Sequence, residues 1–145
     1  MMKDIIIWMR SVHNIDDGED DVMEFTTDGE YFVDGDTYCF SYLESELAGI
    51  EGTRTSVFVR PNEVVVDRDG VMTSRMILRE REKNRFLYKT PYGSATLNVS
   101  TRSIEKRFDE HGGELTVDYV LDMEHTMVTR NKFYVRVRER QAAAQ

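Results

Sequence analysis

A short row of aromatic side chains ends in a carboxylate near the start of the second quarter of the chain. Tyr38, Phe40, Tyr42 and Glu44 occupy alternate positions, so in a β-strand all four side chains would point to the same face. On an inward face Glu44 would need a partner, because burying an unpaired charge is costly. The segment therefore predicts a polar anchor, centred on Tyr42 and Glu44, inside an apolar cavity.

Three arginines are candidate partners for Glu44. Arg54 lies on the next expected strand, Arg75 lies further along, and Arg102 lies in the strand that follows Gly93. A Glu–Arg pair inside the fold would orient one ligand. The alternative interpretation is an exposed pair that contributes little to stability.

The residue types required for metal binding and covalent catalysis do not come together in this sequence. The histidines (His13, His111 and His125) are far apart, and Cys39 lies between two aromatic residues, as a small buried hydrophobic residue would. The acidic run at 16–21 lacks the ligand spacing of a calcium loop. We therefore predict no catalytic residue, no metal and no cofactor, with an enzyme whose site is a dispersed carboxylate–arginine pair as an alternative.

Composition and charge favour one soluble intracellular domain. The chain has 145 residues, one cysteine and a net charge of -8. A lone thiol fits the reducing cytoplasm, and the acidic balance opposes binding to nucleic acid or to an anionic membrane surface. No linker composition divides the chain, so we expect a single domain at 1–140, with residues 141–145 as a frayed tail.

Alternation of apolar and polar residues indicates strands throughout. The clearest series are Leu115, Val117, Tyr119, Leu121 and Met123, and then Phe133, Val135 and Val137. Turn signals, among them Asp-Gly pairs at 28–29, 34–35 and 69–70, recur at intervals of about eight to fifteen residues and favour an antiparallel meander. Only Ser103–Glu110 is expected to form a helical turn or a loop.

A meander of about eight to ten strands exposes two edges unless it closes, so we predict an all-β antiparallel barrel in preference to a sandwich. The interior of such a barrel is either filled by side chains or holds one small ligand. The ligand-binding hypothesis predicts an interior cavity of about 300 Å³ or more, and an interior filled by side chains would contradict it.

Several segments together resemble the YwiB-like family of small bacterial proteins of uncharacterised function, over a stretch from about Ile6 to Val137. They are Phe40-Ser41-Tyr42-Leu43-Glu44, Gly52-Thr53-Arg54-Thr55, Thr90-Pro91-Tyr92-Gly93, Ser100-Thr101 and Leu115-Thr116-Val117-Asp118-Tyr119. The resemblance implies a calycin-like barrel, related in shape to lipocalins, in the bacterial cytoplasm, and it implies no activity or cofactor. Tyr92 and Thr101 match the family pattern and complete the set of candidate ligand contacts with Tyr42, Glu44, Arg54, Arg75 and Arg102.

The function that the sequence favours is non-enzymatic binding of a small, partly apolar molecule in the interior or mouth of the barrel. The alternative is a solid barrel that acts as a protein-interaction module, as a monomer or a homodimer. Its candidate surface is the basic strand at 130–140, which otherwise pairs with acidic neighbours on the adjacent strand.

Overall fold

The computed structural model describes residues 2–15, 18–44, 51–123 and 127–140. Within these ranges each strand pairs antiparallel with its neighbours in the sequence, and the pairing of the first strand with the last closes the barrel. The predicted all-β antiparallel meander barrel is therefore confirmed. The ten strands of the described residues are β1 (Lys3–Ile15), β2 (Asp20–Asp34), β3 (Thr37–Leu43), β4 (Arg54–Val59), β5 (Val64–Asp69), β6 (Thr73–Leu78), β7 (Lys83–Thr90), β8 (Gly93–Asp109), β9 (Gly112–Met123) and β10 (Met127–Glu139).

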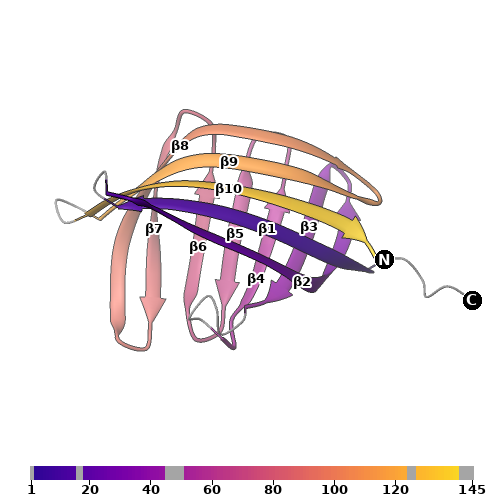
Figure 1. Cartoon of the computed structure of the whole chain (residues 1–145), viewed down its shortest axis with the longest axis horizontal. Helices are drawn as coiled ribbons and strands as arrows, with labels where there is room; N and C mark the ends of the chain where they lie inside the picture. Colours follow the sequence, from indigo (N-terminus) through magenta and orange to yellow (C-terminus); the bar gives the residue numbers. More distant parts are fainter. Residues whose placement is uncertain (1, 16–17, 45–50, 124–126, 141–145) are drawn as a thin grey trace, which may run out of the picture.

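The strands fall into a long set and a short set. β8, β9, β10, β1 and β2 lie side by side along the length of the molecule, and β3 to β7 run steeply across them (Figure 1). β8 has 17 residues, whereas β4, β5 and β6 have 6 each. The interior is thus a layer of side chains between two crossing halves of one closed sheet. No helix in the described part is long and apolar enough to cross a membrane.

The apolar core occupies the end of the barrel where the first strand begins and the last strand ends. Ile5 and Ile7 of β1, Val135 and Val137 of β10 and Leu115 of β9 are at most 1% exposed. The register places Ile7 opposite Val137 and Val135 opposite Leu115, so their inward faces meet. Burial of aliphatic side chains of this size stabilises the fold by roughly 1.5–3 kcal/mol each.

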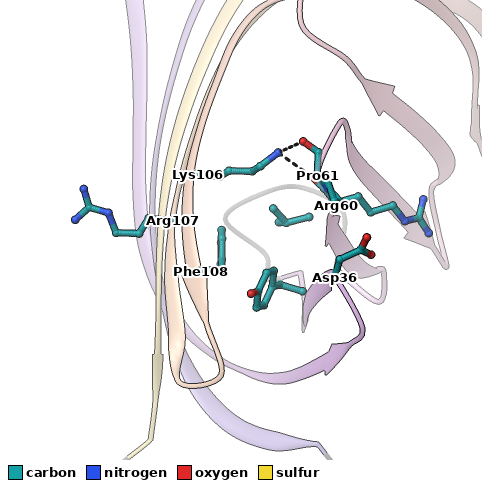
Figure 2. Close-up of a pocket in the computed structure, with 8 residues that line it drawn as sticks. Asp36, Arg60, Pro61, Lys106, Arg107 and Phe108 are labelled. Carbon is teal, nitrogen blue, oxygen red and sulfur yellow. Dashed lines mark hydrogen bonds between the residues drawn. The ribbon is translucent and has the colours of Figure 1, made fainter.

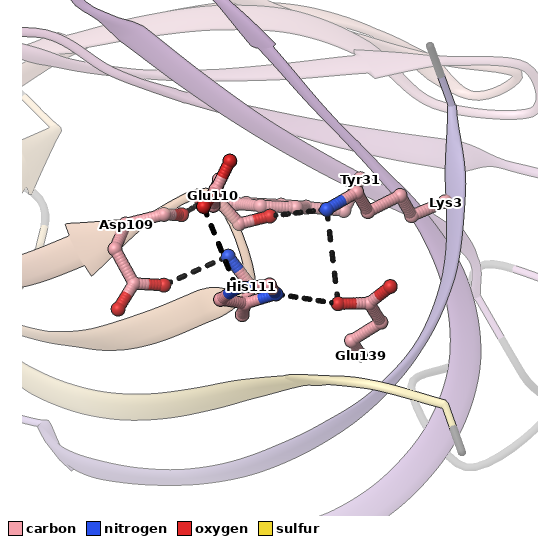
Figure 3. A network of polar contacts seen from close by, with 6 residues as sticks. All are labelled: Lys3, Tyr31, Asp109, Glu110, His111 and Glu139. Atoms are coloured by element: carbon pink, nitrogen blue, oxygen red, sulfur yellow. Dashed lines mark hydrogen bonds and ion pairs between the residues drawn. The ribbon is translucent and has the colours of Figure 1, made fainter.

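Polar contacts fasten the β8–β9 turn at this same end (Figure 3). The Tyr31 hydroxyl donates to the carbonyl oxygen of Asp109 at 2.6 Å. His111 Nδ1 and Glu139 Oε2 form a hydrogen bond of 2.8 Å, and Lys3 Nζ lies 3.7 Å from the same carboxylate oxygen. These contacts connect the β8–β9 turn to β1, β2 and β10. They therefore reinforce the region where the pairing of β1 with β10 closes the barrel.

The expectation of a helical turn or loop at Ser103–Glu110 is wrong. β8 continues as a strand through Asp109, and the register between β8 and β9 shifts between Thr101 and Ser103. A bulge of this kind inserts one residue and exchanges the inward and outward phases of the strand. The alternation is therefore broken in the sequence although the strand is not.

The expectation of a turn at Asp28-Gly29 is also wrong, because both residues lie inside β2. A Cβ atom on Gly29 would lie 2.5 Å from the carbonyl oxygen of Ser41 and 2.7 Å from Cδ1 of Ile7. Glycine is required here because the backbone of β3 approaches closely, and not because the chain turns.

Candidate functional site

The inward-facing side chains change from apolar to polar toward one end of the barrel. β1, β3 and β5 run in the same direction in the meander, so their C-terminal ends meet at that end. Each inward series begins with buried aliphatic or aromatic residues and finishes with polar ones. The series are Ile5, Ile7, Met9, Ser11 and His13 in β1, Phe40, Tyr42 and Glu44 in and just after β3, and Val64, Val66 and Arg68 in β5.

A cavity of about 170 Å³ lies at this polar end. It is smaller than the roughly 300 Å³ expected for ligands of ordinary size. A dry cavity of about 150 Å³ nevertheless accommodates benzene, so the space suits a molecule of a few heavy atoms. Its apolar wall comprises Met9, Met23, Phe25, Val57, Val66, Met76 and Phe133, and its polar wall comprises Ser11, His13, Tyr42, Glu44, Thr55, Arg68 and Tyr119.

Two residues that line the cavity each have a buried polar atom without a hydrogen-bond partner. Thr55 of β4 and Arg68 of β5 are cross-strand neighbours, and Thr55 is 1% exposed. Neither Thr55 Oγ1 nor Arg68 Nε has a hydrogen-bond partner. Leaving a buried polar group unsatisfied costs about 1–3 kcal/mol, and such groups are rare in folded proteins. Because Arg68 Nε has almost no accessible surface, a ligand or water with an acceptor atom would satisfy this donor after a shift of the Arg68 side chain.

Tyr42 and Tyr119 supply protonated hydroxyl groups to the same cavity. Burial raises the pKa of Tyr42, and the nearby Glu44 carboxylate raises it further, while the Arg68 guanidinium opposes the shift. Burial also raises the pKa of Tyr119, again against the influence of Arg68. Both phenols therefore keep their protons at neutral pH; the Tyr42 hydroxyl donates to the Glu44 carboxylate, and the Tyr119 hydroxyl is available as a donor.

His13, which lines the polar wall, pairs with an asparagine on the adjacent strand β10. His13 of β1 and Asn131 of β10 are opposite each other in the register. His13 Nδ1 lies 2.5 Å from Asn131 Oδ1, and Asn131 Nδ2 donates to the carbonyl oxygen of Thr129 at 3.0 Å. With its amide fixed by the backbone, Asn131 holds the imidazole in one orientation beside the cavity.

Of the seven candidate contacts proposed from the sequence, only Tyr42 and Glu44 line this cavity. Thr101 faces the interior, is 3% exposed, and its Oγ1 also lacks a partner. It lies opposite Tyr119 in the register of β8 and β9. Tyr92 is 99% exposed at the β7–β8 turn, where it lines a different hollow of about 450 Å³.

The three arginines considered as partners of Glu44 lie on the outer face. Arg54 Nη1 lies 3.6 Å from Glu30 Oε1, and Arg75 Nη1 lies 3.8 Å from Asp67 Oδ2. Arg102 is exposed beside the bulge of β8. The idea that any of them meets Glu44 in the interior is wrong, because each occupies the outward phase of its strand.

A further hollow of about 300 Å³ lies at the opposite, apolar end of the barrel (Figure 2). Its floor includes the stacked rings of Tyr38 and Phe108, whose centroids are 5.7 Å apart. Lys106 Nζ donates to the carbonyl oxygens of Arg60 and Pro61 at 2.8 and 2.6 Å. The ammonium group that borders this hollow is thus already satisfied by the protein, unlike Arg68 Nε in the polar cavity.

Comparison with known proteins places the barrel in a family. A family model described as "Domain of unknown function (DUF1934)" matches residues 7–135. The chain belongs to the DUF1934 family. The uncharacterized β-barrel protein YwiB of Bacillus subtilis (strain 168) is 33% identical over 104 residues, which cover 72% of this chain and 72% of that protein. The crystal structure of the YwiB protein from Bacillus subtilis matches with a TM-score of 0.86 and 26% identity, over 97% of this chain and 94% of that one.

The resemblance to YwiB-like barrels is therefore confirmed. The DUF1934 description and the name of the relative state no activity, so the function of this barrel must be argued from its own cavity.

In the part of the chain that the structure describes, no three His, Cys, Asp or Glu residues form a group that would hold a metal ion. Asp16 and Asp17 of the acidic run, His125 and the tail at 141–145 lie outside the described residues.

The basic strand of this DUF1934 barrel is largely balanced by acidic neighbours. Arg136 Nε lies 3.5 Å from Glu114 Oε1, and Lys132 is opposite Asp118 in the register of β10 and β9. The Tyr134 hydroxyl donates to the same Glu114 oxygen at 2.9 Å. Arg136 therefore has the cross-strand charge pairing that the sequence analysis gives as the alternative to an anion-binding stripe, and Lys132 lies opposite an acidic residue.

Arg68 and His13 are the main residues of the site that the sequence did not single out. Arg68 is two and four residues after Val66 and Val64, so it shares their phase. That signal was hidden because Val65 is apolar as well, which left the inward face of β5 undefined. His13 follows Met9 and Ser11 in the same way, on a strand whose first residues are apolar in both phases.

Proposed function

We propose that this barrel is a non-enzymatic binding protein that holds a small, partly apolar molecule in the cavity at its polar end. The observation that carries the proposal is the pair of buried atoms, Arg68 Nε and Thr55 Oγ1, that lack partners beside an apolar wall. Selection for stability alone favours filling such a space or pairing such groups. A ligand with an acceptor and an apolar body would account for both features at once.

The size of the cavity restricts the ligand. At about 170 Å³ the cavity is too small for a fatty acid or a nucleotide to enter completely. By comparison with a benzene-binding cavity of about 150 Å³, it fits a molecule of roughly ten heavy atoms or fewer. Methionines in its wall, Met9, Met23 and Met76, are flexible enough to adjust to such a ligand.

Native mass spectrometry of the protein purified from its source organism tests this function. We expect an added mass of roughly 100 Da, as suits a cavity near the size that holds benzene, and we expect it to disappear on denaturation. Arg68→Gln should lose the adduct, whereas Arg75→Gln, which removes an arginine from the outer face, should keep it. A bare protein mass for the wild-type protein under every gentle condition would contradict the proposal.

A second candidate function, self-association, has one observation in its favour. A row of apolar residues crosses the outer face of β2 to β6, where each residue is the register partner of the next. The same spectra would show a dimer mass, and Phe58→Lys should convert the dimer to a monomer. A monomer at all concentrations would exclude this candidate. The row consists of Phe32, Cys39, Phe58, Val65 and Ile77; Cys39 and Val65 are buried within the chain, so its accessible surface comes from Phe32, Phe58 and Ile77.

A further inference from the structure

We propose that the ligand is a zwitterion: a small apolar molecule that carries an anionic group, which meets Arg68, and a cationic group, which meets Glu44. The inference rests on the proposed function, because it concerns the ligand of the same cavity. It goes further in assigning the chemical class of that ligand, of which an apolar amino acid is the simplest example.

The first argument is that two opposite charges line one cavity without joining. Glu44 is 8% exposed, and Arg68 is partly buried with its Nε unsatisfied. Both line the cavity, and Glu44 has a hydrogen bond with Tyr42, yet among the described residues neither Glu44 nor Arg68 forms an ion pair. Opposite charges that face one space at a separation too large for direct contact leave room for a molecule that contacts both.

The second argument comes from the arginines on the outer face. Arg60, Arg79 and Arg75 each lie within 3.8 Å of a carboxylate oxygen of Glu63 or Asp67. Several surface arginines are therefore paired closely with carboxylates even where solvent weakens the benefit. In the interior, where an unpaired charge costs more, Arg68 and Glu44 are the ones left apart. A ligand that carries one group of opposite charge for Arg68 and another for Glu44 would give both interior charges the ion pairs that the surface arginines already have.

The third argument is electrostatic and excludes ligands with a single charge. A simple anion would compensate Arg68 but would bring a second negative charge close to the buried Glu44. A simple cation would compensate Glu44 and be repelled by Arg68. At short range in a poorly solvated cavity, either repulsion opposes binding strongly. Only a ligand with both charges satisfies both groups, and Met9, Phe25 and Phe133 supply an apolar surface for the rest of the molecule.

Matched ligand sets on the wild-type protein test the charge requirement without any mutation. One set has a straight body, 6-aminohexanoate with hexanoate and hexylamine, and the other has a branched body, leucine with 4-methylpentanoate and 3-methylbutylamine. Binding is measured by isothermal titration calorimetry on protein freed of small molecules by unfolding and refolding. We expect at least one zwitterion to bind tenfold or more tightly than both of its singly charged analogues.

Variants assign each charge to its residue. Glu44→Gln should remove the preference over the carboxylate analogue, and Arg68→Gln should remove the preference over the amine analogue. Arg75→Gln and Glu30→Gln, matched changes on the outer face, should leave both preferences intact. Circular dichroism confirms that each variant is folded, and the wild-type series remains decisive if a variant does not fold.

The outcomes separate this inference from the proposed function. If an anion or an amine binds the wild-type protein as tightly as its zwitterion, the zwitterion class is overturned while the cavity remains a binding site. If no compound binds but native mass spectrometry reveals an adduct, the class is again wrong and the function stands. If no compound binds and no adduct exists, both are overturned.

Discussion

Two buried threonines on neighbouring positions of the fold differ in whether their hydroxyl groups have partners. Thr53 is 0% exposed, and its Oγ1 accepts a hydrogen bond from the backbone amide of Met72 at 3.3 Å. Thr55 is 1% exposed, and its Oγ1 has no partner. The first hydroxyl contributes to the fold, whereas the second faces the cavity and adds a desolvation penalty to the ligand-free protein.

This contrast predicts opposite effects of the same substitution. Thr55→Val should leave the free energy of unfolding of the ligand-free protein unchanged or raise it by about 1 kcal/mol, because valine removes an unsatisfied group at nearly constant volume. Thr53→Val should lower it by about 1–2 kcal/mol, because the Met72 amide loses its acceptor. Urea unfolding followed by fluorescence of Trp8 measures both. A clear loss of stability in Thr55→Val would mean that its hydroxyl has a partner in solution.

The single cysteine illustrates how burial decides the chemistry of one residue. Cys39 is 2% exposed, and burial raises the pKa of its thiol to about 12. At neutral pH the thiol is therefore almost entirely protonated and a poor nucleophile. The structural interpretation of Cys39 as a small buried side chain, and not a catalytic one, agrees with its position on the packed outer face of β3.

At the scale of elements, the β8–β9 turn is connected to β10 through a titratable pair. The hydrogen bond with Glu139 raises the pKa of His111, although burial and Lys3 act in the opposite direction. The same hydrogen bond lowers the pKa of Glu139. His111 therefore stabilises the fold fully below its ordinary pKa near 6.5, and this contribution is lost as the pH rises through the raised value.

We expect an NMR titration of the His111 ring to give a pKa above 6.5, the ordinary value. Glu139→Gln should bring it back toward 6.5, because the charged acceptor is lost. The ring signals of His13, at the other end of β1, serve as the internal control and should be the same in both proteins at the starting pH. A His111 pKa that Glu139→Gln leaves unchanged would show that the pair does not form in solution.

The elements also show where sequence reasoning succeeded. Strands with strict alternation, such as β9 with Leu115 and Val117 inward, were predicted with the correct inward face because only one phase was apolar. The turns at Asp34-Gly35 and Asp69-Gly70 were found because glycine there adopts positive φ, 60° and 146°. The aromatic row of β3 likewise placed Tyr42 and Glu44 in the interior.

The rest of the site was missed for a related physical reason. β5 and β6 each carry apolar residues in both phases, for example Val65 beside Val66 and Ile77 beside Met76. Alternation then gives no inward face, and Arg75, which shares the phase of Ile77, is a candidate for the interior on that pattern. The register pairs Asp67 with Arg75 on the outer face, and leaves Arg68 inward. Only the closure of the sheet settles which phase is buried.

At the scale of the whole molecule, the apolar core and the candidate binding site lie at opposite ends of the closed barrel. The end with Ile5, Val137 and Leu115 supplies the apolar core, and the hollow that Lys106 borders opens there. The opposite end contains the polar cavity, with its unsatisfied Thr55 and Arg68. Binding proteins often retain local groups that do not favour stability at the site where function requires them. The gradient along the strands is thus the property of the barrel that bears most directly on function.

The central claim is that a small molecule binds inside this cavity, and methionine-methyl NMR locates the ligand most directly. The protein, labelled with ¹³C at its eight methionine methyl groups, is titrated with the low-mass fraction of an extract of the source organism. We expect the signals of Met9, Met23 and Met76, which line the cavity, to shift, while the exposed Met2 and the buried Met72 stay in place. Shifts confined to methionines outside the cavity, or none at all, would contradict the account.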